Sequence, residues 1–175
     1  MGIFEPKPFL EIPDADWLRF FEVNVMSGVR LTRHYLPGML AKKWGRVVFI
    51  SSESAQQSPT EMVHYGMTKT AQVAIARGIA QSVAGSGVTV NSILVGPTES
   101  EGVGTYLDSM AAQKNVSKAE IERQFFISAR PSSLLKRFQT PEEIAAMVAF
   151  VVSSQAATIN GSAVRAEGGV IQSIL

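Results

Sequence analysis

Hydrophobic side chains recur at helical spacing over two long stretches of the chain. From Asp14 to Ala41 they return every three or four residues, which predicts an amphipathic helix with Asp14 as its N-cap. Pro37-Gly38 is expected to interrupt this helix near its end. A second helix is predicted from Met62 to Ala84, with small residues spread around it, and Gly85-Ser86-Gly87 ends it.

Two short apolar runs rich in β-branched residues flank the second helix. They are Arg46–Ser51, entered through Gly45, and Val88–Leu94. Runs of this kind are typical of buried parallel strands. A strand, a helix of about twenty residues and another strand form a βαβ unit, so we expect a parallel sheet with a right-handed crossover.

The rest of the chain, from residue 98 on, is less regular. Residues 98–133 are mostly polar and contain two predicted short helices, near 103–112 and 118–126, the second capped by Ser117. The sequence Thr140-Pro141-Glu142-Glu143 predicts a stronger helix start, and that helix is expected to end near Val152. A last strand is expected at 162–166. No repeat or low-complexity segment divides the chain, so we predict one α/β domain over residues 1–175.

Composition narrows the classes of function. The chain has 175 residues with a net charge of +1, and its basic residues are scattered, which argues against a nucleic-acid partner. It has no cysteine, which excludes disulfides, thiolate metal sites and thiol catalysis, and its two histidines leave little room for a metal site. No secretory or membrane segment is expected, because the uncharged stretch 144–164 is broken by polar residues. The default expectation is a soluble, cytoplasmic protein.

Tyr65 and Lys69 are the first candidates for chemistry. Four residues apart on a predicted helix, they lie on one face, and an ammonium beside a phenol is expected to lower the tyrosine pKa. Such a pair is more often simply exposed. Ser52 follows a predicted strand, at the edge where open parallel sheets bind ligands, but it could equally cap a turn. Asn24 lies within the first predicted helix, where a tolerated surface residue is the alternative.

Taken together and in order, these motifs resemble the short-chain dehydrogenase/reductase family. The resemblance rests on Phe21–Val25, Val48–Ser52, Tyr65-Gly66-Met67-Thr68-Lys69, Val88–Gly96, and the closing Ile159-Asn160-Gly161 and Glu167-Gly168-Gly169. It covers essentially the whole chain. The fold that it implies is a Rossmann-like, doubly wound parallel sheet.

The resemblance also implies a role for each site residue. Tyr65 is the general acid/base and also belongs to the cofactor-binding site. Ser52 hydrogen-bonds the reacting oxygen, and Lys69 lowers the Tyr65 pKa and holds the nicotinamide ribose. Asn24 bends its helix and anchors a water that connects Lys69 to solvent. Gly96 lies against the nicotinamide, with Thr98 and Ser100 in reach of its carboxamide. The implied cofactor is NAD or NADP, and the preference cannot be predicted from this sequence.

The sequence departs from the family at its front. The family's Gly-rich turn is absent, and the chain begins just after the family's "NNAG" motif, so the first mononucleotide-binding half is expected to be missing. The strand after Gly45 would then be an exposed apolar edge, which favours aggregation. Val95 stands where the family usually has proline.

Several hypotheses follow for function. The leading one is an NAD(P)-dependent oxidoreductase that interconverts a carbonyl and a secondary alcohol, acts on a small molecule and assembles as a homo-oligomer, a dimer or tetramer. The alternative is a non-catalytic, truncated relative that only associates with other subunits. A serine hydrolase using Ser52 is disfavoured, because the chain has no G-x-S-x-G elbow.

Further expectations concern the surroundings of the site. Residues 98–133 are predicted to be a substrate lid, with an apolar pocket formed by Tyr106, Leu107, Met110, Phe125 and Phe126. Glu53 is a weaker candidate for lining the cleft, and His64 is expected to be structural or solvent-facing.

Overall fold

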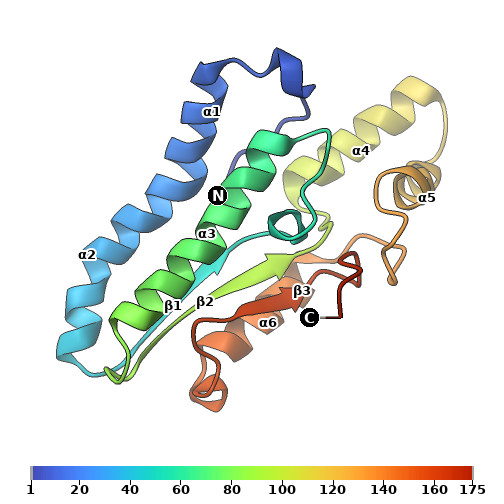
Figure 1. Cartoon of the computed structure of the whole chain (residues 1–175). Coiled ribbons are helices and arrows are strands. Elements are labelled where there is room, and N and C mark those ends of the chain that lie inside the picture. The colour runs from blue at the N-terminus through green and yellow to red at the C-terminus, as the bar shows by residue number, and fades with distance from the viewer. Residues whose placement is uncertain (1, 175) are drawn as a thin grey trace.

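A parallel sheet of three strands forms the centre of the molecule (Figure 1). The computed structural model describes residues 2–174. The strands are β1 (Gly45–Ile50), β2 (Val88–Val95) and β3 (Ala163–Ala166), in the order β1-β2-β3. Gly45 pairs with Val88, so the two strands run side by side from their first residues. The predicted βαβ unit is confirmed.

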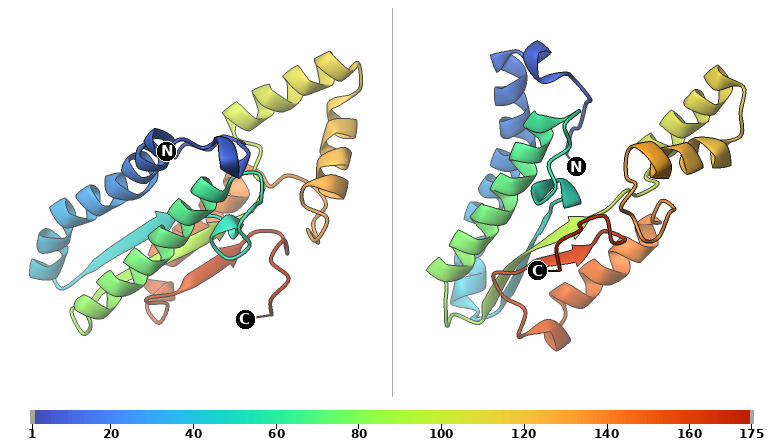
Figure 2. Two further views of the ribbon diagram at one scale, coloured as in Figure 1. Left: turned by 45° about the horizontal axis from the view of Figure 1, so that its top comes forward. Right: turned by 45° about the vertical axis from the view of Figure 1, so that its right-hand side comes forward.

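Helices cover both faces of this sheet. The helices α1 (Asp14–Phe21), α2 (Ser27–Ala41) and α3 (Val63–Ser82) lie on one face, and α6 (Pro141–Val152) lies on the other (Figures 1 and 2). The helices α4 (Glu101–Lys114) and α5 (Lys118–Ser128) pack on each other and extend away from the sheet (Figure 2). Short 3-10 turns, η1 (Phe9–Glu11), η3 (Glu53–Ala55) and η4 (Ser154–Ala156), complete the elements. The layers are those of a Rossmann-type α/β fold.

The main hydrophobic core lies between α3, α2 and the sheet. Phe49 of β1, Val88 and Val90 of β2 and the small residues Ala76 and Ala80 of α3 are all buried there. The alanines let α3 approach the strands closely, which explains why small residues are spread along this helix.

The first long helix differs from the prediction in three ways. It is divided by a π turn, η2 (Glu22–Met26), between α1 and α2. Pro37 does not end the helix, which runs on to Ala41; this proline is exposed, so water can reach the carbonyl that it leaves unpaired. Asp14 is not the N-cap, because Pro13 occupies that position and Asp14 is the first helical residue.

The other two predicted helix starts are confirmed. The Ser117 hydroxyl accepts a hydrogen bond from the Glu120 backbone N–H, and α5 follows. Thr140 and Glu143 form a reciprocal capping box, with Pro141 as the first residue of α6.

β1 is an edge strand among the described residues, as expected. It pairs with β2 on one side only, and Ile50 at its end is 47% exposed. Within residues 2–174 no helix combines the length and the apolarity that crossing a membrane requires.

Candidate active site

Tyr65 and Lys69 lie together in the first two turns of α3. The Lys69 ammonium is 5.5 Å from the centroid of the Tyr65 ring, so the two side chains share one face. Lys69 is only 6% exposed, which rules out the interpretation of the two as a surface pair. Its Nζ donates to the Ile50 carbonyl at 3.0 Å and to Gln72 Oε1 at 3.4 Å.

Burial controls the titration of both groups. It raises the pKa of Tyr65 to about 12, although a hydrogen bond with Ser52 lowers that pKa in part. It lowers the pKa of Lys69 to about 8. The lowered Tyr65 pKa that the pairing with Lys69 led us to expect is not found, because burial, the largest effect on this pKa, raises it. At neutral pH, Tyr65 is a phenol that can donate a proton.

Ser51 and Ser52 follow β1 directly and both are buried. The Ser51 hydroxyl donates to the Lys69 carbonyl at 2.9 Å, which ties the strand end to α3. Ser52 accepts a hydrogen bond from the Ser54 N–H at 3.1 Å and so caps η3, as the alternative interpretation expected. The Ser52 side chain also hydrogen-bonds with Tyr65, so the same hydroxyl both caps η3 and belongs to the candidate catalytic site.

Asn24 lies in the π turn, buried against α3. Its side-chain amide donates to Thr68 Oγ1 at 3.1 Å and to the Ile3 carbonyl at 2.9 Å, and its backbone carbonyl accepts a hydrogen bond from Gln72 Nε2 at 2.5 Å. Asn24 is therefore not a tolerated surface residue. Gln72 joins the Asn24 backbone carbonyl to the Lys69 ammonium. Sequence reasoning missed Gln72, although its position three residues after Lys69 on a helix was a usable indication.

The loop after β2 holds Gly96, Thr98 and Ser100. A Cβ on Gly96 would lie 2.4 Å from the Glu167 carbonyl, so this close approach of two backbones requires glycine. The Thr98 hydroxyl donates to the Gly96 carbonyl at 3.0 Å. Ser100 stands at the N-cap of α4 without a side-chain capping bond. Because β1 and β2 are parallel, this loop lies at the same sheet edge as Ser52.

The apolar side chains of the 98–133 segment that were predicted to line a substrate pocket do not form one in the structure. Leu107 and Phe126 are buried in the packing between α4 and α5, with Phe125 and Met110 packed against them. Tyr106 is 60% exposed. These side chains fill a small core of their own, because two amphipathic helices stand away from the sheet and have to cover each other.

Glu53 and His64 are both buried beside the site. Glu53 pairs with Arg130, whose Nε lies 3.0 Å from Glu53 Oε1, and this contact was not predicted. The His64 ring packs against Phe20 with centroids 4.1 Å apart, and neither ring nitrogen has a hydrogen-bond partner among the described residues. His64 is structural, and it does not activate Ser52 as a hydrolase triad would require.

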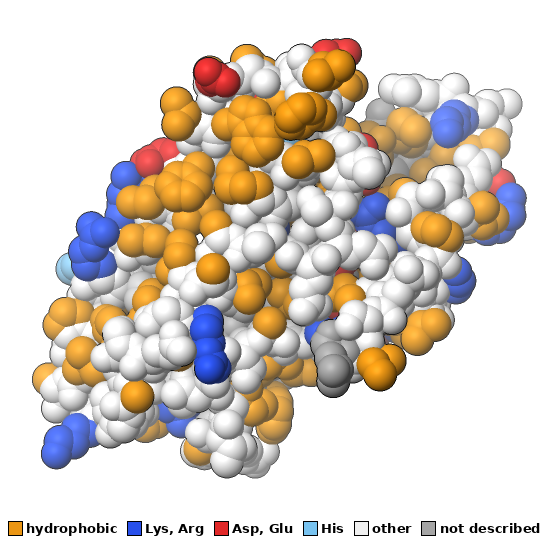
Figure 3. Space-filling model, in the orientation of Figure 1, with side chains coloured by type: hydrophobic (Ala, Val, Ile, Leu, Met, Phe, Trp, Pro, Cys, Tyr) orange, Lys and Arg blue, Asp and Glu red, His pale blue; other side chains and the backbone are white. Residues whose placement is uncertain are grey.

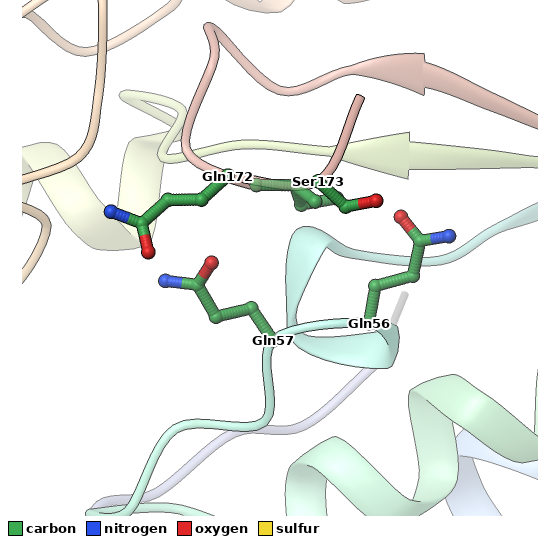
Figure 4. Close-up of a pocket in the computed structure, with 5 residues that line it drawn as sticks. Gln56, Gln57, Gln172 and Ser173 are labelled. Carbon is green, nitrogen blue, oxygen red and sulfur yellow. The ribbon is translucent and has the colours of Figure 1, made fainter. Parts of the chain in front are cut away.

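An open pocket of about 400 Å³ lies between the residues after η3 and the C-terminal segment. Figure 4 shows the side chains of Gln57 and Gln172 facing each other across it, with Gln56 and Ser173 at its other end. None of the candidate catalytic residues lines this pocket. Its lining combines the side chains of three glutamines and a serine with the apolar Ile171.

The site can accommodate a nicotinamide ribose at Lys69. A lysine ammonium has three N–H donors, and two of them are accounted for by Ile50 and Gln72. The third is left for a ribose hydroxyl. The Ser100 hydroxyl, which does not cap α4, is a second polar group on the same sheet edge.

Comparisons with known proteins find relatives over almost the whole chain. A family model described as "Enoyl-(Acyl carrier protein) reductase" matches residues 1–171. The chain is 49% identical over 99% of its length to the "Uncharacterized oxidoreductase YvaG" of Bacillus subtilis, and 30% identical over 97% of its length to the 3-oxoacyl-[acyl-carrier-protein] reductase FabG of Aquifex aeolicus. It spans 66% and 62% of the length of these two relatives.

Among solved structures, L-sorbose reductase from Gluconobacter frateurii, complexed with NADPH and L-sorbose, superposes with a TM-score of 0.92. The two sequences are 26% identical, and the match covers 99% of this chain and 65% of that one.

Proposed function

The chain belongs to the short-chain dehydrogenase/reductase family of oxidoreductases, and from this we propose that it carries the catalytic residues of an NAD(P)-dependent enzyme interconverting a carbonyl and a secondary alcohol. The observation that carries the proposal is the buried chain of contacts from Ser52 through Tyr65 and Lys69 to Gln72 and Asn24. The nicotinamide cofactor, when bound, supplies or accepts the hydride.

Tyr65 is the proton donor of this proposal. Its pKa of about 12 keeps the phenol protonated at neutral pH, so it can give a proton to a carbonyl oxygen during reduction. Ser52 hydrogen-bonds the same oxygen and fixes its position. Lys69 offers its remaining N–H to the ribose, and Asn24 together with Gln72 holds the lysine in place.

The loop and the projecting helices complete the proposed site. Gly96, Thr98 and Ser100 flank the nicotinamide, and the segment 98–133 with α4 and α5 acts as the substrate lid. Support comes from the position of the loop at the carboxyl edge of the sheet and from α4 and α5 standing beyond that edge (Figure 2). The proposed substrate is a small carbonyl or alcohol compound.

We also propose that the protein assembles as a homo-oligomer. Figure 3 shows hydrophobic side chains gathered over α1 and the start of α3. Leu18 of α1 and Leu31 and Tyr35 of α2 are between 59% and 70% exposed. Apolar side chains exposed together on one side of a protein are typical of an interface between subunits.

The test combines nucleotide binding with turnover. We expect NADH or NADPH to bind saturably to the purified chain. Nucleotide fluorescence monitors the binding, and light scattering gives the mass of the protein in the same sample. Tyr65→Phe should bind nucleotide as the wild type does, because the ring is kept, and should lose turnover of a panel of carbonyl compounds by at least about 100-fold.

Lys114→Met, a change at an exposed lysine of α4, is the matched control and should leave both measurements unchanged. Near-normal turnover by the Tyr65→Phe variant would contradict the catalytic assignment. A stable oligomer without nucleotide binding would favour the alternative of a non-catalytic subunit.

A further inference from the structure

We propose that Phe4 is a specificity-determining residue, and that its ring contacts the substituent next to the reacting carbonyl of the substrate. The proposal rests on the function proposed above, in which Tyr65 gives a proton to the carbonyl oxygen. It deepens that function by naming a class of substrate, a carbonyl compound whose substituent on the Phe4 side is apolar and flat, such as an aryl group.

Phe4 is a large apolar side chain that lies beside the proposed proton donor. The centroids of the Phe4 and Tyr65 rings are 6.5 Å apart, and the two rings meet edge-on at 71°. Phe4 is nevertheless 57% exposed. Part of its ring is therefore packed on Tyr65, and the rest is open to a ligand.

The chain on both sides of Phe4 is anchored. The Ile3 backbone N–H donates to Asn24 Oδ1 at 2.7 Å, and the Ile3 carbonyl accepts from Asn24 Nδ2 at 2.9 Å. Three residues after Phe4, the Lys7 N–H donates to the Glu61 carbonyl at 2.9 Å, shortly before α3 begins. These hydrogen bonds fix the backbone around Phe4, so the position of its ring is set by the fold.

The same segment passes the ammonium of Lys69. A Cβ on Gly2 would lie 3.7 Å from Lys69 Nζ. Residues 2–4 therefore run from Lys69 to Tyr65, which share one face of α3. In the proposed reaction the carbonyl oxygen is hydrogen-bonded to Tyr65, so the group attached to the carbonyl carbon lies within about 5 Å of the phenol oxygen. At that distance it can reach a ring that is packed on Tyr65.

The charged side chains that neighbour Phe4 in sequence are paired with α1. Glu5 Oε2 lies 3.0 Å from Arg19 Nη2, and Lys7 pairs with Asp16. The segment therefore presents an apolar ring to the site, while its charges are engaged by α1.

The cations that other elements bring to the site are engaged as well. Arg130, near the end of the lid segment, lies 3.0 Å from Glu53 and 3.2 Å from Glu61. The remaining N–H of Lys69 is assigned above to the nicotinamide ribose. A substrate carboxylate requires an unpaired cation when it leaves water, so these contacts argue against an acidic substituent.

An aryl substituent gains most from a ring such as that of Phe4. Two aromatic rings in edge-to-face or offset contact attract each other by more than the apolar area that they bury. We therefore expect the affinity to fall from an aryl ketone to a short alkyl ketone, and to be lowest for a keto acid.

The experiment measures ketone binding without turnover. We titrate para-fluoroacetophenone with the purified chain in the presence of NAD⁺ or NADP⁺, and its ¹⁹F NMR signal reports the bound fraction. An oxidised nucleotide cannot reduce a ketone, so the titration gives Kd alone. Acetophenone, butanone and acetoacetate then compete with the probe and should displace it in that order of effectiveness. Light scattering gives the mass of each variant, and circular dichroism confirms that it is folded.

Phe4→Ala should weaken the binding of para-fluoroacetophenone by about fivefold, because it removes one partner of an aromatic pair. Phe4→Tyr keeps the ring and should stay within about twofold of the wild type. Phe9→Ala is the matched control and should leave the affinity unchanged. Phe9 precedes α1 and is 59% exposed, but its ring lies against Trp17, with centroids 6.4 Å apart.

Three results would overturn the proposal. The first is equal weakening by Phe4→Ala and Phe9→Ala, and the second is a wild type that does not bind the aryl ketone or binds acetoacetate as well as acetophenone. The third is a Phe4→Ala variant that changes the mass of the protein and not the ketone affinity, which would place Phe4 in a subunit contact. Near-normal turnover by Tyr65→Phe would count against the proposed function and would leave these affinities unaffected.

Discussion

Lys69 is a cation whose two hydrogen-bond acceptors, the Ile50 carbonyl and the Gln72 amide, are uncharged. Burial therefore lowers its pKa from 10.5 to about 8. The unfolded chain keeps this proton up to pH 10.5, whereas the folded protein releases it near pH 8. Between these values the unfolded state binds more protons, so stability rises with pH.

We expect the free energy of unfolding to increase by about 2 kcal/mol between pH 7.5 and 9.5 on account of Lys69. Urea unfolding at the two pH values measures it. Lys69→Met should lack this increase and should be more stable than the wild type at pH 7.5. Lys114→Met, at an exposed position, should retain the wild-type difference. A Lys69→Met variant with the same pH dependence as the wild type would contradict the burial argument.

Prediction from sequence succeeded best for single residues that lie on regular elements. Tyr65 and Lys69 follow helical spacing, and Ser52 follows a strand end, so their neighbourhood could be predicted. The pair of Glu53 and Arg130 could not, because the two residues are 77 positions apart and no periodicity relates them. The predicted direction of the Tyr65 pKa shift was wrong for a related reason, since the degree of burial depends on the packing of elements distant in sequence.

Among the elements, α6 has the most completely defined start. Thr140 Oγ1 accepts the Glu143 N–H, the Glu143 carboxylate accepts the Thr140 N–H, and Arg137 binds the same carboxylate through two nitrogens. These contacts satisfy two N–H groups that a helix start otherwise leaves unpaired. The helix covers the face of the sheet opposite to α3.

Thr140→Ala is expected to lower the free energy of unfolding by about 1 kcal/mol, because it leaves the Glu143 N–H without its acceptor. Thermal and urea unfolding both measure this change. Thr105→Ala removes a threonine hydroxyl from the exposed side of α4 and should cost less than about 0.5 kcal/mol. Equal costs for the two substitutions would show that the cap contributes nothing beyond an ordinary surface threonine.

Helices with strong caps could be predicted from sequence, and the packing partners of α4 and α5 could not. Both helices were expected, yet the apolar side chains assigned to a substrate pocket pack between them. The sequence pattern of an amphipathic helix is the same whether its apolar face meets a ligand or another helix. Whether the apolar faces of α4 and α5 meet a ligand or each other depends on how the two helices project from the sheet.

At the scale of the whole molecule, the feature with the largest consequence is the edge of β1 that no strand pairs with among residues 2–174. A groove of about 230 Å³ between α2 and β1 exposes parts of Leu31, Tyr35, Val47 and Val48. An unpaired strand beside apolar side chains can pair with another chain. The parallel pairing of β1 with β2 and the edge position of β1 were both predictable, whereas the place of β3 beside β2 was not predicted.

Ile50→Lys is expected to reduce concentration-dependent self-association of the 175-residue chain, measured by light scattering. The side chain is 47% exposed, so a lysine there can reach solvent, and a charge on an edge strand opposes strand pairing. Leu134→Lys, at an 83% exposed position outside the sheet, is the control for added charge alone. The same reduction by both variants would mean that net charge, and not the β1 edge, governs association.

The π turn at Glu22–Met26 sets the rotational phase of α1 relative to α2. A π turn holds one residue more than an α-helical path over the same length, and one residue corresponds to about 100° of rotation. Without this extra residue, Trp17 and Phe20 of α1 would turn away from the His64 ring while Leu36 and Met39 of α2 kept their places on the core. The single added residue thus rotates the apolar face of α1 relative to that of α2, so that each helix packs its apolar side chains on a different surface.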